Sequence, residues 1–537
     1  MIAAGLVMTS RVRKSAHDEP VALDIAQIDA ETVSRCTPSA RPALAAGVQL
    51  WRDASQWEAL PKFEAAAEAD PACAAASVLY LEAATHTFPR RREHFRRARE
   101  QRSSLSPRER DLLDVLEPTV LDPPDYQESA TRAAALLARL PYDPDVRRLL
   151  VRALYQLGRL DEALRAADAP AFAALPDPEI ECLEAKIEVE RRKPEAAADH
   201  FSRCLHLSPD SSDCMQWEAL LSASSGDCSE AEDVLKHLTS VMPQSSEAYF
   251  ELGNVLLTTT GDPAAARGAF EQRWLRSKKN SFGASSSPET ARLGDEYRLA
   301  ILAGRLEEAL PIAERWNEAT SDTNNGRFRG EARIQLIELL RERGKTDEAR
   351  RLASTSLSEQ RVWTGDEVLD GSIEIARLAY LTGALDEQGF RDLRTKWLAK
   401  ERRAPEEAWL HAYAGLPKVG ADIDPPVAAG DYVQNWYSMS PESFSRAADE
   451  LRIRGVAEAV KHAEAAVHCC LAFSPMGNVH SWGARANAYD AAGDRDAACG
   501  AYRDVANRLR ASPASATARQ ANTRLRALSC EGNNSHD

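Results

Sequence analysis

Residues 178–245 read PEIECLEAKIEVERRKPEAAADHFSRCLHLSPDS and then SDCMQWEALLSASSGDCSEAEDVLKHLTSVMPQS, two segments of 34 residues with one apolar pattern. The positions held by Ala185, Ala197, Phe201 and Pro209 in the first segment are held by Ala219, Ala231, Leu235 and Pro243 in the second. Residues 144–177 precede them as a third segment of the same length. A fixed period of this size predicts repeated supersecondary units, each stacked on the next.

A glycine marks the predicted turn within each unit. Glycine is followed four residues later by Glu-Ala at Gly158, Gly226, Gly304 and Gly344, and in looser form by similar residues at Gly383 and Gly493. Because glycine tolerates a positive φ, it can end the first helix of a helical hairpin. The alanine then lies where the second helix comes closest to its neighbour, so a larger side chain would not fit.

The spacing resembles that of tetratricopeptide repeats, whose pattern is W-x2-L-G-x2-Y…A-x3-F…P over about 34 residues. Other units supply the same positions, with Ala46, Gly47, Leu50, Ala59, Phe63 and Pro71 in residues 40–73, Tyr249, Leu252, Gly253, Leu256, Ala266 and Phe270 after residue 245, and Trp482, Ala486, Tyr489, Ala498 and Tyr502 near the C-terminus. The resemblance implies an all-α fold, a right-handed solenoid of about ten helical hairpins in two sub-arrays.

Polar and proline-rich stretches divide the predicted array. We expect a mostly irregular leader at residues 1–38, an N-terminal array at 39–277, a loop at 278–289, a middle array at 290–415, a linker at 416–441, a C-terminal array with a cap at 442–530 and a polar tail at 531–537. The linker is the clearest boundary, because it contains Pro425-Pro426 and two further glycines.

The composition favours helix and argues against two kinds of partner. The 537 residues are 44% hydrophobic and 28% charged, with a net charge of −15. An acidic surface repels phosphate backbones, so no nucleic acid is expected as a partner. No apolar run approaches the roughly 20 residues of a complete membrane helix. The apolar Ile2–Met8, followed by basic residues, is either a frayed start or the stump of a membrane helix. We expect a cytoplasmic protein in the first case, and a membrane-associated or periplasmic one in the second.

The two ends of the array resemble a more specific group of proteins. Gly47–Asp53 resembles the start, and Ala488–Asp494, Ala498–Arg503 and Ser512–Ala518 the end, of tetratricopeptide regions that follow a membrane helix in certain bacterial serine/threonine protein kinases. The chain has none of the GxGxxG, HRD and DFG motifs that such kinases need for phosphoryl transfer. The resemblance implies the sensory or docking arm of a kinase system, truncated or encoded apart from its kinase.

This second resemblance gives Cys499 and Cys530 a role. One lies on the last clear repeat and the other follows the capping helix, so a disulfide between them would staple the cap; two buried free thiols are the alternative. Cys204 and Cys214 are a further candidate pair, because the end of one hairpin lies near the start of the next. The sequence contains no CxxC motif, and we predict no metal site.

The remaining question is what the array binds. The sequence has no HExxH, GxSxG, P-loop or dinucleotide fingerprint, so we expect neither catalysis nor a cofactor. A solenoid offers its concave face, which is lined by the first helix of each hairpin. Outward positions on these helices are Arg148, Arg152, Tyr155, Lys186, Phe250 and Asn254. The cations would hold a carboxylate and the rings an apolar anchor of a bound peptide. The leading prediction is a scaffold or adaptor for another protein, and the alternative is the kinase arm.

Overall fold

The computed structural model describes residues 25–84, 89–121, 124–169, 176–191, 193–259, 263–277, 288–321, 326–359, 372–400, 455–472 and 474–530. Its first fifteen helices are α1 (Ile25–Ser34), α2 (Arg41–Arg52), α3 (Gln56–Ala69), α4 (Ala74–Ala83), α5 (Pro89–Glu100), α6 (Pro107–Leu116), α7 (Tyr126–Arg139), α8 (Pro144–Gln156), α9 (Leu160–Ala167), α10 (Pro178–Glu190), α11 (Pro194–Leu207), α12 (Ser212–Ser225), α13 (Cys228–Val241), α14 (Ser246–Thr259) and α15 (Pro263–Ser277). The others are α16 (Pro288–Leu302), α17 (Leu306–Ser321), α18 (Gly326–Glu342), α19 (Thr346–Glu359), α20 (Ser372–Thr382), α21 (Glu387–Lys400), α24 (Val456–His468), α25 (Pro475–Ala492), α26 (Arg495–Arg508) and α27 (Ala516–Ala527), with 3-10 turns at Arg102–Ser104 and Glu117–Val120.

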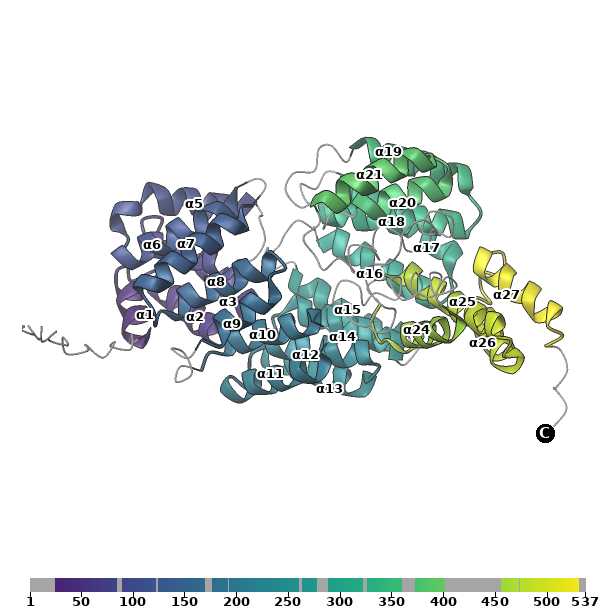
Figure 1. Ribbon diagram of the computed structural model, residues 1–537, viewed down its shortest axis with the longest axis horizontal. Helices are drawn as coiled ribbons and strands as arrows, with labels where there is room; N and C mark the ends of the chain where they lie inside the picture. Colours follow the sequence, from purple (N-terminus) through teal and green to yellow (C-terminus); the bar gives the residue numbers. More distant parts are fainter. Residues whose placement is uncertain are drawn as a thin grey trace, which may run out of the picture.

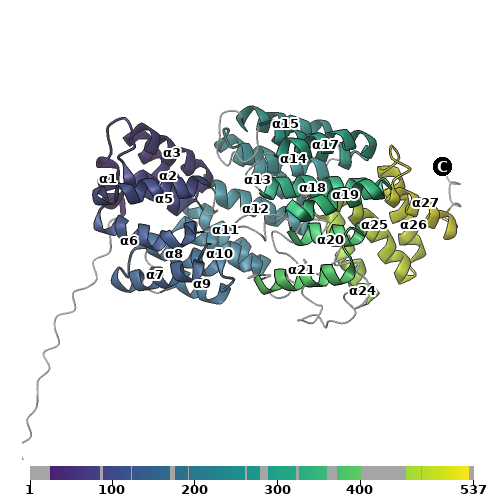
Figure 2. The ribbon, with the colours of Figure 1, turned by 90° about the horizontal axis from the view of Figure 1, so that it is seen from above.

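Consecutive helices pack as antiparallel hairpins, and each hairpin stacks on the next (Figure 1). The chain is therefore an all-α helical-hairpin solenoid, which confirms the predicted fold class. Helices α1 to α9 lie at one end of the molecule, α25 to α27 at the other, and α10 to α21 between them (Figures 1 and 2). Within the described residues, no helix has the length and apolar character to cross a bilayer.

Helix starts recur with the period of the repeat. Asp143, Asp177, Ser211 and Ser245 are spaced by 34 residues, and the side chain of each accepts a backbone N–H from the first turn of the next helix. Such caps satisfy N–H groups that have no partner within the helix. Proline then occupies the first turn of α8 and α10, where its missing N–H removes no hydrogen bond.

Glycine acts at two kinds of position. The six predicted turn glycines all have a positive φ, for example 68° at Gly158 and 87° at Gly226, as expected. Gly253 lies instead within α14, where a Cβ would overlap the ring of Phe270 on α15. Gly47 on α2 faces Phe63 on α3 in the same way. A glycine against an aromatic ring thus sets how closely the two helices of a hairpin approach.

Distant hairpins also touch at their turns. The Ser211 hydroxyl donates to the carbonyl of Ala54, 157 residues earlier, at 2.8 Å. The Ser512 hydroxyl donates to the carbonyl of Gly304 at the same distance, 208 residues earlier. The Cys470 N–H donates to Ala223 O at 2.9 Å. The solenoid therefore curls so that the turn of one hairpin meets the loop after a much later helix.

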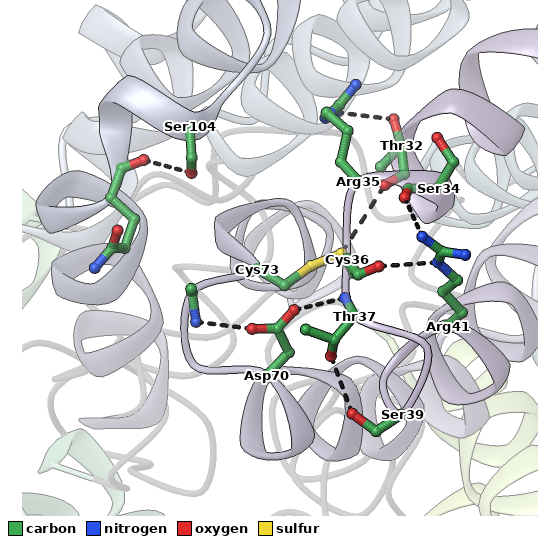
Figure 3. The surroundings of a disulfide bond; sticks show 12 residues. Thr32, Ser34, Arg35, Cys36, Thr37, Ser39, Arg41, Asp70, Cys73 and Ser104 are labelled. Atoms are coloured by element: carbon green, nitrogen blue, oxygen red, sulfur yellow. Dashed lines mark hydrogen bonds between the residues drawn. A yellow bond between two sulfur atoms is a disulfide. The ribbon is translucent and has the colours of Figure 1, made fainter.

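Four disulfides join the described cysteines, namely Cys36–Cys73, Cys204–Cys214, Cys228–Cys470 and Cys499–Cys530. Figure 3 shows the first of them. Beside it, the Asp70 carboxylate accepts the N–H of Thr37 at 2.8 Å and that of Ala72 at 3.2 Å, so the loops carrying both cysteines are tied to one side chain (Figure 3). Cys182 and Cys469 are buried thiols.

Several of the predicted segments lie wholly or partly outside the described residues. The leader, predicted to be mostly irregular, is described only from residue 25, where it forms helix α1, Ile25–Ser34; the Thr32 hydroxyl of this helix donates to Glu109 on α6. The linker at 416–441 and the tail at 531–537 lie outside the described residues, as does most of the loop at 278–289. The division into sub-arrays stays a prediction.

Candidate interaction face of the first helices

The first helices carry acids and cations at the period of the repeat. Asp145, Glu179 and Asp213 hold one position in three consecutive units, and Arg152 and Lys186 hold another in two. Each cation lies beside the acid 27 residues later: Arg152 Nη2 is 2.5 Å from Glu179 Oε1, and Lys186 acts electrostatically on Asp213. We call these five residues the inner charge ladder. All are buried except Arg152, which is half-buried.

Arg148 strengthens the same contact between units. Its Nε and Nη2 each lie 2.8 Å from a carboxylate oxygen of Asp177, the residue that caps α10. Its Nη1 also lies 3.2 Å from Asp145 Oδ1. The guanidinium groups of Arg148 and Arg152 lie 5.3 and 4.6 Å from the ring centroid of Trp51 on α2. Charged hydrogen bonds and one aromatic face therefore join three hairpins at this face.

Burial and ion pairing shift the pKa values of the acids on this face in opposite directions. Burial raises the pKa of Asp213 to about 8, and the nearby Lys186 offsets this only in part. Burial also raises the pKa of Glu82 on α4 to about 8, and the charge of Asp145 adds to the rise. Burial acts likewise on Asp145, but Arg52 and other guanidinium groups nearby hold its pKa well below the usual value. At neutral pH the face thus carries protonated and ionised carboxyls together.

The six residues predicted to face outward differ in exposure. Arg148, Lys186 and Asn254 are buried, with 4%, 9% and 0% of their surface exposed, so the expectation of outward side chains is wrong for these three. For Arg148 and Lys186 the physical reason is the stacking of the array, because the next hairpin supplies Asp177 and Asp213 beside these cations. Their role in binding a peptide stays a prediction.

Arg152, Tyr155 and Phe250 are half-buried and keep some exposed surface. The Tyr155 hydroxyl donates to Glu190 Oε1 at 2.5 Å. The guanidinium groups of Arg273 and Arg298 lie 4.0 and 4.9 Å from the Phe250 centroid. Asn254 donates its amide to the carbonyl of Phe250 at 3.0 Å, so the structure brings these two predicted residues together.

The aromatic partners of the cations were not predicted from the sequence. Lys186 Nζ lies 4.8 Å from the ring centroid of Trp217, in the same arrangement as Arg152 over Trp51. The acids of the ladder were missed as well, although their spacing of 34 residues is visible in the sequence. The signal was available in the repeat, once charged positions are aligned together with the apolar ones.

The structure places the predicted cap cysteines in a disulfide. Cys499 on α26 and Cys530 after α27 are bonded, with their Cα atoms 5.6 Å apart. Arg503 donates to Cys530 O at 2.5 Å, and Arg495 donates to Leu528 O at 2.8 Å, so α26 also holds the end of the cap by hydrogen bonds. Cys204 and Cys214 are bonded too, across the turn between α11 and α12.

Comparison with known proteins gives similarity to solved structures only. No protein-family model matches the chain, and no relative is found among curated proteins. The chain is similar to a human IFIT1 dimer with PPP-AAAA, at 14% identity over 84% of this chain and 95% of that chain, with a TM-score of 0.33. It is also similar to Naa15/Naa10 bound to HypK-THB, at 13% identity over 95% of this chain and 94% of that chain, with a TM-score of 0.25. For the TPR domain of P58(IPK) the identity is 15% over 72% and 98% of the two chains, with a TM-score of 0.18. Similarity at this level says nothing about what this chain binds.

Proposed function

We propose that this chain is a non-catalytic interaction protein, a scaffold or adaptor that holds an extended segment of another protein against its first helices. The observation that carries the proposal is the placement of a cation over the half-buried rings of Trp217 and Phe250 on this face. Rings of this kind are common anchors at protein interfaces, because they bury a large apolar area with little loss of entropy.

The buried ladder supports this role indirectly. Each ion pair joins one hairpin to the next, so the face is held in a fixed curvature before a partner arrives. A preorganised face loses less conformational entropy on binding than a flexible one. The half-buried groups, among them Arg152, Tyr155 and Phe250, are then the ones that contact the bound segment. The net charge of −15 favours a protein over a nucleic acid as the partner.

Site-specific photo-crosslinking in the native cell tests this proposal. A photoreactive amino acid at Tyr155 or Trp217, both half-buried, should crosslink to one segment of one partner protein. The matched control is the exposed His237 on α13, away from the first helices. Crosslinks of equal yield and identity from all three positions would exclude the first-helix face as the binding site.

A second candidate is the sensory or regulatory region of a serine/threonine kinase system, outside the cytoplasm. The disulfides favour it, since eight of the ten cysteines pair in this structure and stable disulfides are rare in a reducing cytosol. Rapid alkylation during denaturing lysis of the cells, which exposes the buried thiols, followed by non-reducing peptide mapping, tests this placement. Eight protected cysteines would support an oxidising compartment. Ten alkylated cysteines would exclude it and favour the cytoplasmic adaptor.

A further inference from the structure

A histidine and two glutamates converge between α10 and α11. Glu181 and Glu184 lie three residues apart on α10, which places them on one helix face, and His200 on α11 faces them. His200 Nδ1 is 2.8 Å from Glu181 Oε2 and 3.5 Å from Glu184 Oε2. One potential ligand atom from each residue lies within 4.8 Å of the others, which is close enough for all three to bind one ion.

Glu184 is the most unusual member of this group. Its side chain is buried, and its neighbours include a further acid, Asp168, with which it shares a hydrogen bond. Burial raises the pKa of Glu184 to about 8, and the negative charges of Asp168 and Glu181 raise it further. A buried carboxyl group beside two other acids is costly to ionise, because burial and like charges both disfavour its charged form. A bound cation would remove this cost.

His200 is placed between two incompatible neighbours. Its Nδ1 is 2.8 Å from the Glu181 carboxylate and 2.5 Å from Nη2 of Arg203. A ring nitrogen either donates to a carboxylate or accepts from a guanidinium, so one nitrogen cannot satisfy both. Arg203 is half exposed and also pairs with Glu181 at 2.9 Å. It is therefore free to swing into solvent if another cation takes its place.

We propose that Glu181, Glu184 and His200 bind a divalent metal ion of the zinc class. Imidazole nitrogen with carboxylate oxygens is a ligand set that Zn²⁺ accepts, and three protein ligands leave a further position for water. The ion accepts the Nδ1 lone pair of His200 and lone pairs of both glutamates, while the proton that Glu184 holds at neutral pH leaves to solvent and Arg203 moves aside. Because the ligands come from both helices, the metal fastens α10 to α11. The sequence alone did not suggest this site, since Glu184 and His200 are separated by the turn of the hairpin.

Isothermal titration of the full-length protein with ZnCl₂, after chelator treatment and dialysis, tests the site. Wild type should bind one equivalent of Zn²⁺ at these three ligands. His200→Ala and Glu181→Gln should each weaken binding by at least about tenfold, since even residues that only support a metal's ligands change affinity by about 10–100-fold. The control His237→Ala removes an exposed histidine from α13 and should leave the affinity unchanged.

Arg203→Ala gives a test of opposite sign. It removes the competing cation, so Zn²⁺ should bind more tightly than to wild type. The control is Arg267→Ala, which removes an exposed arginine from α15. If Zn²⁺ were held only by non-specific acidic groups, the two variants would gain the same affinity. Circular dichroism checks that each variant is folded. Absence of Zn²⁺ binding to wild type, or equal affinities of His200→Ala and His237→Ala, would overturn the proposal.

Discussion

Cys228, at the first position of α13, is bonded to Cys470, which lies 242 residues later and just beyond α24. The N–H of Cys470 also donates to the carbonyl of Ala223, near the end of α12, so a hydrogen bond lies beside the covalent one. The disulfide therefore joins the middle of the solenoid to its C-terminal helices. In a solenoid with neighbour contacts alone, these segments would be independent.

Removing this disulfide should destabilise the protein more than removing a local one. By chain entropy, Cys228→Ser with Cys470→Ser should lower the free energy of unfolding by about 5 kcal/mol, and Cys204→Ser with Cys214→Ser by about 3 kcal/mol. The second pair closes a loop of only 10 residues in sequence separation. Urea unfolding followed by circular dichroism measures both. Equal losses would contradict the entropic account of the long link.

The buried ion pair of Arg148 should matter more than an exposed one. Arg148→Met leaves the Asp177 carboxylate buried without its guanidinium, which typically costs about 3–5 kcal/mol. Arg96→Met removes exposed pairs with Glu93 and Glu100 on α5 and should leave the unfolding midpoint nearly unchanged. Equilibrium unfolding in urea compares the two. A stable Arg148→Met variant would show that the acid finds another donor.

The pH dependence of stability should carry the signature of Asp213. Its pKa rises from an ordinary value of 3.8 to about 8 on folding, so the folded state binds the proton more tightly. Its contribution to stability is complete below pH 4 and is lost as the pH rises through about 8. The unfolding free energy of wild type should therefore fall between pH 5 and pH 8, and in Asp213→Asn this fall should be smaller. Asp233→Asn, at an exposed position on α13, is the control and should keep the wild-type slope.

Glycine to alanine exchanges should have opposite signs at two positions. Gly253→Ala places a Cβ against the Phe270 ring and should destabilise by about 1–3 kcal/mol, as overpacking does. Gly268 lies within α15 with open space around it, so Gly268→Ala should stabilise by about 0.5–1 kcal/mol through helix propensity. Thermal unfolding distinguishes the two. Similar shifts of the melting temperature in both variants would mean that helix propensity, not the contact with the Phe270 ring, determines the effect of Gly253→Ala.

The sequence could predict what depends on neighbours within one repeat. The hairpin turns follow from Gly158 and Gly226, and the helix pairing follows from the Gly253 and Phe270 positions, because each of these acts inside a single unit. The burial of Arg148 and Lys186 could not be predicted in this way, because it depends on how closely the next unit stacks. The bond between Cys228 and Cys470 depends on the curvature of the whole array, which no local pattern encodes.

The contact between Ala54 and Ser211 has a consequence for biosynthesis. Ala54, in the turn after α2, leaves the ribosome 157 residues before Ser211, in the loop that will cover it. Simple repeat arrays can fold progressively as they emerge, because each unit needs only the one before it. Here the core of α2 to α4 lies within residues 36–84, but the turn after α2 stays uncovered until the loop between α11 and α12 is made, and contacts of such long separation slow folding and prolong the exposure of unfinished surfaces. A nascent chain that stalls before Ser211 is thus a natural client for chaperones.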